Sequence, residues 1–166
     1  IYVGDAKTGS VVKFAAGYLG LRKETPVIEG FAVKGTGWGT LGPAGIQYNG
    51  TLIGHGNKCD DTLYVVDGVD NTLVPVSKAS NLLVTGEIQV EPGGKTFVCK
   101  AKKFTCATLV HGGSPLDEPV ALALLPNGNL VAANGKGGNV LVEISAAGKV
   151  LATKKLNNDR IADVYA

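Results

Sequence analysis

The sequence predicts an all-β protein assembled from repeated four-stranded antiparallel units, and three stretches carry that prediction. The clearest lies at 120–153, where apolar runs of strand length flank a Pro126-Asn127-Gly128 turn and a second turn at Gly148. Residues 61–76 and 1–14 each repeat the middle of this pattern as two apolar runs joined by a polar turn. Such turns supply the positive φ angles that hairpins need, and runs of this length suit strands better than helices.

Composition and charge are typical of an ordered protein and do not show the excess of basic residues that is common in proteins that bind nucleic acids or membranes. Hydrophobic residues make up 45% and charged residues 18% of the 166 positions, which is too little charge for a disordered chain. Sixteen Lys and Arg against 14 Asp and Glu leave a net charge of +2. No apolar run approaches the ~18 residues of a spanning helix, and no signal-peptide pattern is present. We therefore expect neither nucleic acid nor membrane as a partner, and we expect a processed or excised chain because Met is absent.

The first predicted unit covers residues 1–41. Its strands at 1–5 and 9–14 match the second and third strands of the repeat, so the first strand of this unit is missing from the chain. The remainder is rich in glycine, with short apolar strands expected at 26–28 and 31–33.

The second predicted unit covers residues 42–110. It enters an apolar strand through a Gly42-Pro43 turn and closes a hairpin at Asn49-Gly50. Asn49-Gly50-Thr51 also matches the N-glycosylation acceptor pattern, although the hairpin turn explains it without a sugar. Further strands are expected at 62–66, 71–76, 81–84 and 87–90.

The third predicted unit covers residues 111–160. Its strand at 120–125 carries six apolar residues in succession, so we expect it to be buried on both faces. Residues 161–166 then read as the first strand of a further unit.

Two cysteines predict a disulfide. Cys99 and Cys106 stand on opposite arms of a short hairpin, where their Cβ atoms can meet at the ~3.8 Å of a disulfide, whereas Cys59 is distant in sequence. The alternative is a pair of reduced buried thiols. A disulfide implies an oxidising compartment, so we expect a secreted or periplasmic protein.

The spacing of the units identifies the type of repeat. Units of ~40–50 residues with four strands are propeller blades, and insertions at 15–41 and 91–106 account for the longer spacing here. The runs Pro126–Asn134 and Thr62–Asp67 resemble those of NHL and SMP-30/gluconolactonase-like β-propellers. The resemblance covers about 1–14, 42–76 and 115–153. It implies four-stranded blades, about three in this chain, as half of a six-bladed ring.

The resemblance also implies where a metal or a catalytic pair would lie. Metal-dependent members hold a divalent cation, such as Ca²⁺ or Mg²⁺, with an Asn after an entrance Pro, an Asp after the second strand, and a Glu. Here Ala44 and Val120 stand at the amide position, while Asp5, Asp67 and Glu118 are the candidate carboxylates. Acidic residues at a turn such as 67–71 also commonly satisfy backbone donors of the turn itself. Propeller lyases would need a His–Glu pair, for which His111 and Glu118 are the candidates.

Two functions from different classes follow. The favoured one is a binding or scaffold module without a catalytic site of its own. The alternative is a metal-dependent hydrolase, lactonase-like, or a lyase whose site is shared with blades outside this chain. In either case a three-blade arc exposes sheet edges, so we expect self-association or a companion fragment that completes the ring. In the two-fold arrangement, residues 161–165 of one copy pair beside residues 1–3 of the other.

Overall fold

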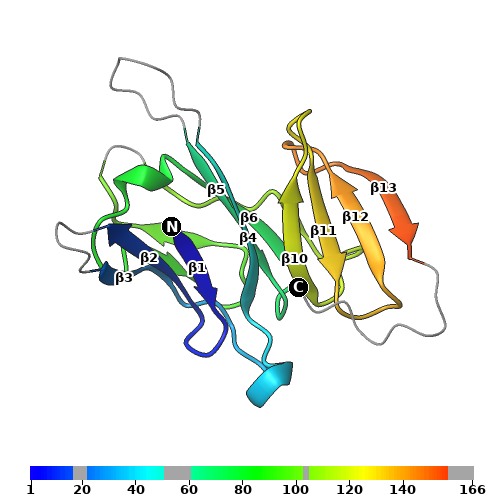
Figure 1. Ribbon diagram of the computed structural model, residues 1–166, viewed down its shortest axis with the longest axis horizontal. Coiled ribbons are helices and arrows are strands. Elements are labelled where there is room, and N and C mark those ends of the chain that lie inside the picture. The colour runs from blue at the N-terminus through cyan, green and yellow to red at the C-terminus, as the bar shows by residue number, and fades with distance from the viewer. Residues whose placement is uncertain (17–21, 51–60, 103–104, 157–166) are drawn as a thin grey trace.

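A computed structural model describes residues 1–16, 22–50, 61–102 and 105–156. Within these ranges the protein contains three β-sheets and two 3₁₀ turns, η2 (Gly37–Gly39) and η3 (Ala79–Asn81), and no α-helix. One sheet lies between the other two (Figure 1). The prediction of an all-β fold of mainly antiparallel sheets is confirmed, while the closed ring remains a prediction.

The middle and third sheets are four-stranded and antiparallel. The middle sheet has the order β4 (Pro43–Asn49), β5 (Thr62–Asp67), β6 (Thr72–Ser77) and β9 (His111–Gly112). The third has the order β10 (Pro119–Leu124), β11 (Leu130–Asn134), β12 (Val140–Ile144) and β13 (Val150–Lys155). These strands follow the apolar runs of the sequence, because each run is of strand length and ends at a polar or glycine turn.

The first sheet is larger and contains a parallel pair. Its order is β1 (Tyr2–Asp5), β2 (Ser10–Ala16), β3 (Arg22–Glu29), β7 (Ile88–Val90) and β8 (Phe97–Cys99). Strand β7 pairs in parallel with the end of β3, with Ile28 opposite Ile88. The β7–β8 hairpin therefore extends the first sheet, although in the sequence it lies between β6 and β9 of the middle sheet.

Three equivalent turns relate the sheets to one another. An Asp or Asn ends the strand before each turn, and these residues are Asp5, Asp67 and Asn134. A residue with positive φ closes each turn, and these residues are Gly9 at 66°, Asn71 at 54° and Asn139 at 57°. Strands β1, β5 and β11 each lead into one of these turns and are therefore counterparts. Strands β4 and β10, the extra inner strands of the other sheets, lie side by side, and β1 lies beside β4.

Two hydrophobic cores fill the spaces on either side of the middle sheet. Leu63 and Val65 of β5 face a core shared with the first sheet, whereas Tyr64 and Val66 face a core shared with the third. Successive side chains of a strand point to opposite faces of the sheet. A strand in a sheet that has a neighbouring sheet on each side therefore carries apolar residues in succession. This is the reason why Leu63, Val65 and Val66 are all fully buried.

Strand β10 shows the opposite case. The sequence predicts burial on both faces, but Ala123 is exposed and only Leu122 and Leu124 pack against a core. The prediction is wrong for the described residues because the third sheet has a neighbouring sheet on one side only.

Two expected strands do not form. Residues 31–33 are irregular, and after them Lys34 makes only an isolated bridge with Leu41. Asn81 ends η3, and in the residues after it Leu82 is fully buried while Leu83 and Val84 are exposed. Only one residue of this apolar run is therefore buried, and it lies in a turn and not in the strand that the sequence pattern predicted. No helix of the described residues is long and apolar enough to cross a membrane.

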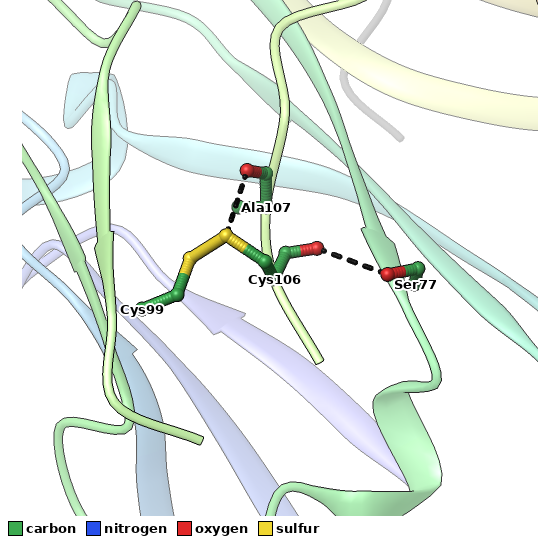
Figure 2. Close-up of a disulfide and its surroundings, with 4 residues drawn as sticks. All are labelled: Ser77, Cys99, Cys106 and Ala107. Atoms are coloured by element: carbon green, nitrogen blue, oxygen red, sulfur yellow. Dashed lines mark hydrogen bonds between the residues drawn. A yellow bond between two sulfur atoms is a disulfide. The ribbon is translucent and has the colours of Figure 1, made fainter. Parts of the chain in front are cut away.

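The predicted disulfide is present (Figure 2). Cys99 and Cys106 are bonded, with their Cα atoms 5.3 Å apart. Cys99 ends β8 of the first sheet, whereas the carbonyl of Cys106 accepts a hydrogen bond from the backbone N–H of Ser77 in β6. The disulfide therefore joins the first sheet to the segment that lies along the middle sheet.

Candidate functional site

The inner edge of the first sheet is open within the described residues. Strand β1 pairs only with β2, whereas its counterparts β5 and β11 pair on both sides. Ile1 and Phe14 exchange backbone hydrogen bonds, so the backbone groups of Tyr2 and Gly4 point away from β2. Ile1 is 79% and Val3 44% exposed. Such an edge presents N–H and C=O groups to which another strand can bind.

A groove of about 430 Å³ adjoins this edge, and its lining comes from β1, β2, β4 and η3. Its polar residues are Tyr2, Lys13, Tyr48 and Ser80, and its apolar residues are Ile1 and Ile46. The rings of Tyr2 and Tyr48 lie 5.7 Å apart, centroid to centroid, across the groove between the first and middle sheets.

A hydrogen-bond network holds one wall of the groove. Tyr2 and Lys13 are cross-strand partners, so their side chains share a face of the first sheet. The Tyr2 hydroxyl donates to the Ala79 carbonyl at 2.7 Å, and Lys13 Nζ donates to the carbonyls of Ser80 at 2.9 Å and Leu82 at 2.7 Å. The edge strand is thus tied to η3 of the middle region through side chains.

Asp61, a buried carboxylate, organises the other wall. It accepts hydrogen bonds from the backbone N–H of Ser80 at 2.6 Å, from the Ser80 hydroxyl at 2.9 Å and from the Tyr48 hydroxyl at 3.0 Å. Burial lowers the pKa of Lys13, while the charges of Asp61 and Glu87 oppose that shift. Burial also raises the pKa of Tyr2 well above its ordinary value, which keeps the Tyr2 phenol neutral, and its O–H donates a hydrogen bond to the Ala79 carbonyl.

Asp5 and Asp67, two of the sequence-predicted metal ligands, begin equivalent turns. Each carboxylate accepts a 2.9 Å hydrogen bond from the backbone N–H two residues later, at Lys7 and at Val69. Asp67 is fully buried, and burial raises its pKa to about 6. The turn-forming interpretation of these residues therefore has direct support.

Glu118 lies where loops of all three sheets meet. Its carboxylate is 3.7 Å from Lys34 Nζ and 3.8 Å from Lys136 Nζ. Its backbone N–H donates to the side-chain oxygen of Asn71 at 2.6 Å, and its carbonyl accepts from the N–H of Gly135 at 2.8 Å. These contacts make Glu118 a connector between sheets.

His111, the proposed partner of Glu118 in a lyase, lies in β9 against the third sheet. Its Nδ1 is 3.1 Å from the Gly148 carbonyl, and its Nε2 is buried with no hydrogen-bond partner in the described residues. No hydrogen bond joins His111 to Glu118 within that part of the chain.

The structure does not bring the remaining sequence-predicted residues together. Among the described residues no group of three or more His, Cys, Asp or Glu side chains could hold a metal. Asn49 ends β4 and is exposed, whereas Thr51 of its glycosylation pattern and the predicted strand at 161–165 lie outside the described residues.

Sequence reasoning missed the network of Tyr2, Lys13 and Asp61. The first two could have been found by counting across the 5–9 turn, which places them opposite one another. Asp61 is far from Tyr2 and Lys13 in the sequence, so no register across a turn could have placed it beside them.

A scan against protein-family models finds no match, and searches of curated proteins and of solved structures find no similar chain.

Proposed function

We propose that this chain is a β-propeller binding and scaffold module that completes its sheets by pairing with a second copy of itself. The open edge of β1 carries the proposal. In the middle and third sheets, an inner strand, β4 or β10, pairs with the counterpart of β1. The corresponding position beside β1 has no strand among the described residues.

The groove beside β1 suits an added strand. Backbone groups of Tyr2 and Gly4 face outward for hydrogen bonding, and the side chains of Ile46 and Tyr48 offer a partly apolar surface next to them. The sequence itself contains a strand pattern at 161–165 that resembles an inner strand. Two copies, each with three sheets, would provide the six blades that the resemblance implies. If each copy adds this strand to the sheet of the other, the backbone groups at both open edges form hydrogen bonds.

The disulfide supports a proposal for the compartment. A bond between Cys99 and Cys106 is maintained in an oxidising environment, which favours a secreted or periplasmic location. A metal-dependent hydrolase or a lyase has no comparable observation in its favour, because Asp67, Glu118 and His111 each have separate partners.

Light scattering at increasing protein concentration tests the proposal. We expect a particle of twice the 17.0 kDa chain mass. Val3→Lys places a charge on the β1 edge and should return the protein to the monomer, because an edge lysine opposes strand pairing. Leu151→Lys on β13 is the matched control, since Leu151 is 46% and Val3 44% exposed, and it should leave the dimer intact.

Three results would contradict the proposal. A monomer at all concentrations excludes the second copy. A dimer that Val3→Lys leaves intact places the contact elsewhere. A single chain bound to a different fragment supports the companion-fragment alternative instead.

A further inference from the structure

Three side-chain oxygens in the β1–β2 turn satisfy one another. The Thr8 hydroxyl donates to Asp5 Oδ2 at 2.7 Å and lies 2.8 Å from the Ser10 hydroxyl. The turn needs no external ligand because a hydroxyl that can donate stands between the carboxylate and the second hydroxyl.

The β5–β6 turn places different chemistry at the same three positions. Asp67, Asp70 and Thr72 correspond to Asp5, Thr8 and Ser10, so a carboxylate replaces the central hydroxyl. Asp67 Oδ2, Asp70 Oδ2 and Thr72 Oγ1 are all buried, and none has a hydrogen-bond partner in the described residues. The side chains of Asp67 and Thr72 are themselves fully buried.

These oxygens converge beneath the β7–β8 hairpin. Asp67 and Thr72 are cross-strand partners, which puts their side chains on one face of the middle sheet. A Cβ atom added to Gly94 would lie 3.0 Å from Asp70 Oδ2 and 3.2 Å from Thr72 Oγ1, so both oxygens face the same point below this glycine. Gly94 therefore lies against Asp70 and Thr72, where a larger residue would crowd both oxygens.

Asp67 Oδ1 accepts the Val69 N–H, but Asp67 Oδ2 and Asp70 Oδ2 are buried with no donor among the described residues. Buried carboxylate oxygens of this kind are stabilised by a compensating positive charge. We propose that Asp67, Asp70 and Thr72 form a binding site for a hard divalent cation, with Ca²⁺ as the preferred ion. The donors are oxygens only, and the two carboxylates balance a charge of +2. Ca²⁺ accepts carboxylate and neutral oxygens in flexible geometry and completes its shell with main-chain carbonyls or water, whereas Mg²⁺ demands near-ideal octahedral geometry.

This site shares Asp67 with the metal site implied by the propeller resemblance but none of its other ligands, and it is independent of the proposed function. The implied site draws side chains from several blades, whereas these three residues belong to one turn. Only two of the three are carboxylates, so the site is not a group of three acidic or histidine side chains.

Calorimetric titration and thermal unfolding of the chelator-treated chain test the site at neutral pH. CaCl₂ should bind with one-to-one stoichiometry and a dissociation constant of roughly 0.1–1 mM, the range of extracellular calcium modules. At ten times that constant, the unfolding midpoint should rise by roughly 3–5 °C. MgCl₂ should act more weakly, and KCl at the same ionic strength should have no specific effect.

Asp70→Thr is the decisive variant because it installs the arrangement of the β1–β2 turn. It should fold, since a Thr side chain is tolerated there in the first sheet, and should lose the calcium-dependent rise. Thr72→Val removes only the hydroxyl at nearly constant volume and should weaken binding, which gives a second test if Asp70→Thr does not fold. Asp117→Asn, an acidic residue in the loop before β10, should respond as the wild type does.

Two results would overturn the proposal. The first is no calcium binding by the wild type at millimolar concentration. The second is a calcium response that survives in both Asp70→Thr and Thr72→Val, which would place the ion elsewhere.

Discussion

The β1–β2 and β5–β6 turns have the same backbone but place the same residue type in opposite environments. Asp5 and Asp67 each begin a turn and each accept a backbone N–H two residues later. The hydrogen bond from Thr8 is the main cause that lowers the pKa of Asp5, whereas burial is the main cause that raises the pKa of Asp67 to about 6. The comparison shows that the local sequence determines the shape of the turn, whereas its chemistry depends both on the local residues and on burial by the neighbouring sheets.

Exchange of the turn-closing residues should produce the largest effect. Gly9→Asn installs the residue that stands at 71, but its Cβ would lie 2.1 Å from the Phe31 carbonyl oxygen. We expect a loss of about 3 kcal/mol or more in the free energy of unfolding. The reverse exchange, Asn71→Gly, removes only the hydrogen bond to the Glu118 N–H and should lower that free energy by about 1 kcal/mol. Equal losses in denaturant unfolding would show that the two turns do not differ in their surroundings.

Removal of the disulfide should have the next largest effect, because it loosens the connection between the two sheets that carry these turns. The double variant Cys99→Ala/Cys106→Ala should lower the free energy of unfolding by about 2–3 kcal/mol, the chain-entropy value for so short a loop. The fold should persist. Hydrogen exchange should report faster opening of β7 and β8 than of β5, and uniform acceleration throughout the chain would contradict this assignment.

Neutralising each turn aspartate should change stability in opposite directions. With chelator present at pH 7, Asp67→Asn should raise the free energy of unfolding by about 1–2 kcal/mol, because it removes a buried charge and retains the acceptor for Val69 N–H. Asp5→Asn should lower stability slightly, because it removes a charge that the Thr8 hydroxyl favours.

The pH profile gives the sign of each contribution. The raised pKa of Asp67 means that its contribution is fully present below pH 3.8 and is lost as pH rises through about 6. The lowered pKa of Asp5 means that its contribution is present above pH 3.8 and is lost as pH falls through the folded-state value. Denaturant unfolding between pH 3 and 8 should therefore show that, above pH 4, the free energy of unfolding falls less steeply with pH in Asp67→Asn than in the wild type. If the free energies of unfolding of the wild type and the variant change with pH in parallel over that range, burial does not raise the pKa of Asp67.

A carboxylate added to the first turn should have the smallest effect. Thr8→Asp reproduces the residue that stands at 70, but in a turn that water can reach. We expect a change in stability within about 0.5 kcal/mol, because solvent screens the new charge pair. A loss of several times that size would mean that the paired carboxylates, and not their burial, distinguish the two turns.

Much of the local structure could be predicted from the sequence. The runs 62–66, 71–76 and 120–125 became strands β5, β6 and β10, because strand length and turn residues are local properties of the chain. The disulfide between Cys99 and Cys106 followed from their proximity in a short segment. The turn role of Asp5 and Asp67 was also available, since an Asx side chain bonds backbone groups two residues away.

The sequence alone determined the all-β class, the turn positions and the disulfide, whereas the tertiary structure decided which sheets the strands join and which turns are buried. The pairing of β3 with β7 joins segments that are separated in the sequence by β4, β5 and β6 of the middle sheet, and no periodicity encodes such a contact. The same pairing brings Gly94 over Asp70 and Thr72 and gives the β5–β6 turn its buried oxygens. Burial depends on neighbours that are distant in sequence, so residues 5–9 and 67–71 could both be recognised as turns from the sequence, whereas the burial of the second turn could not be predicted.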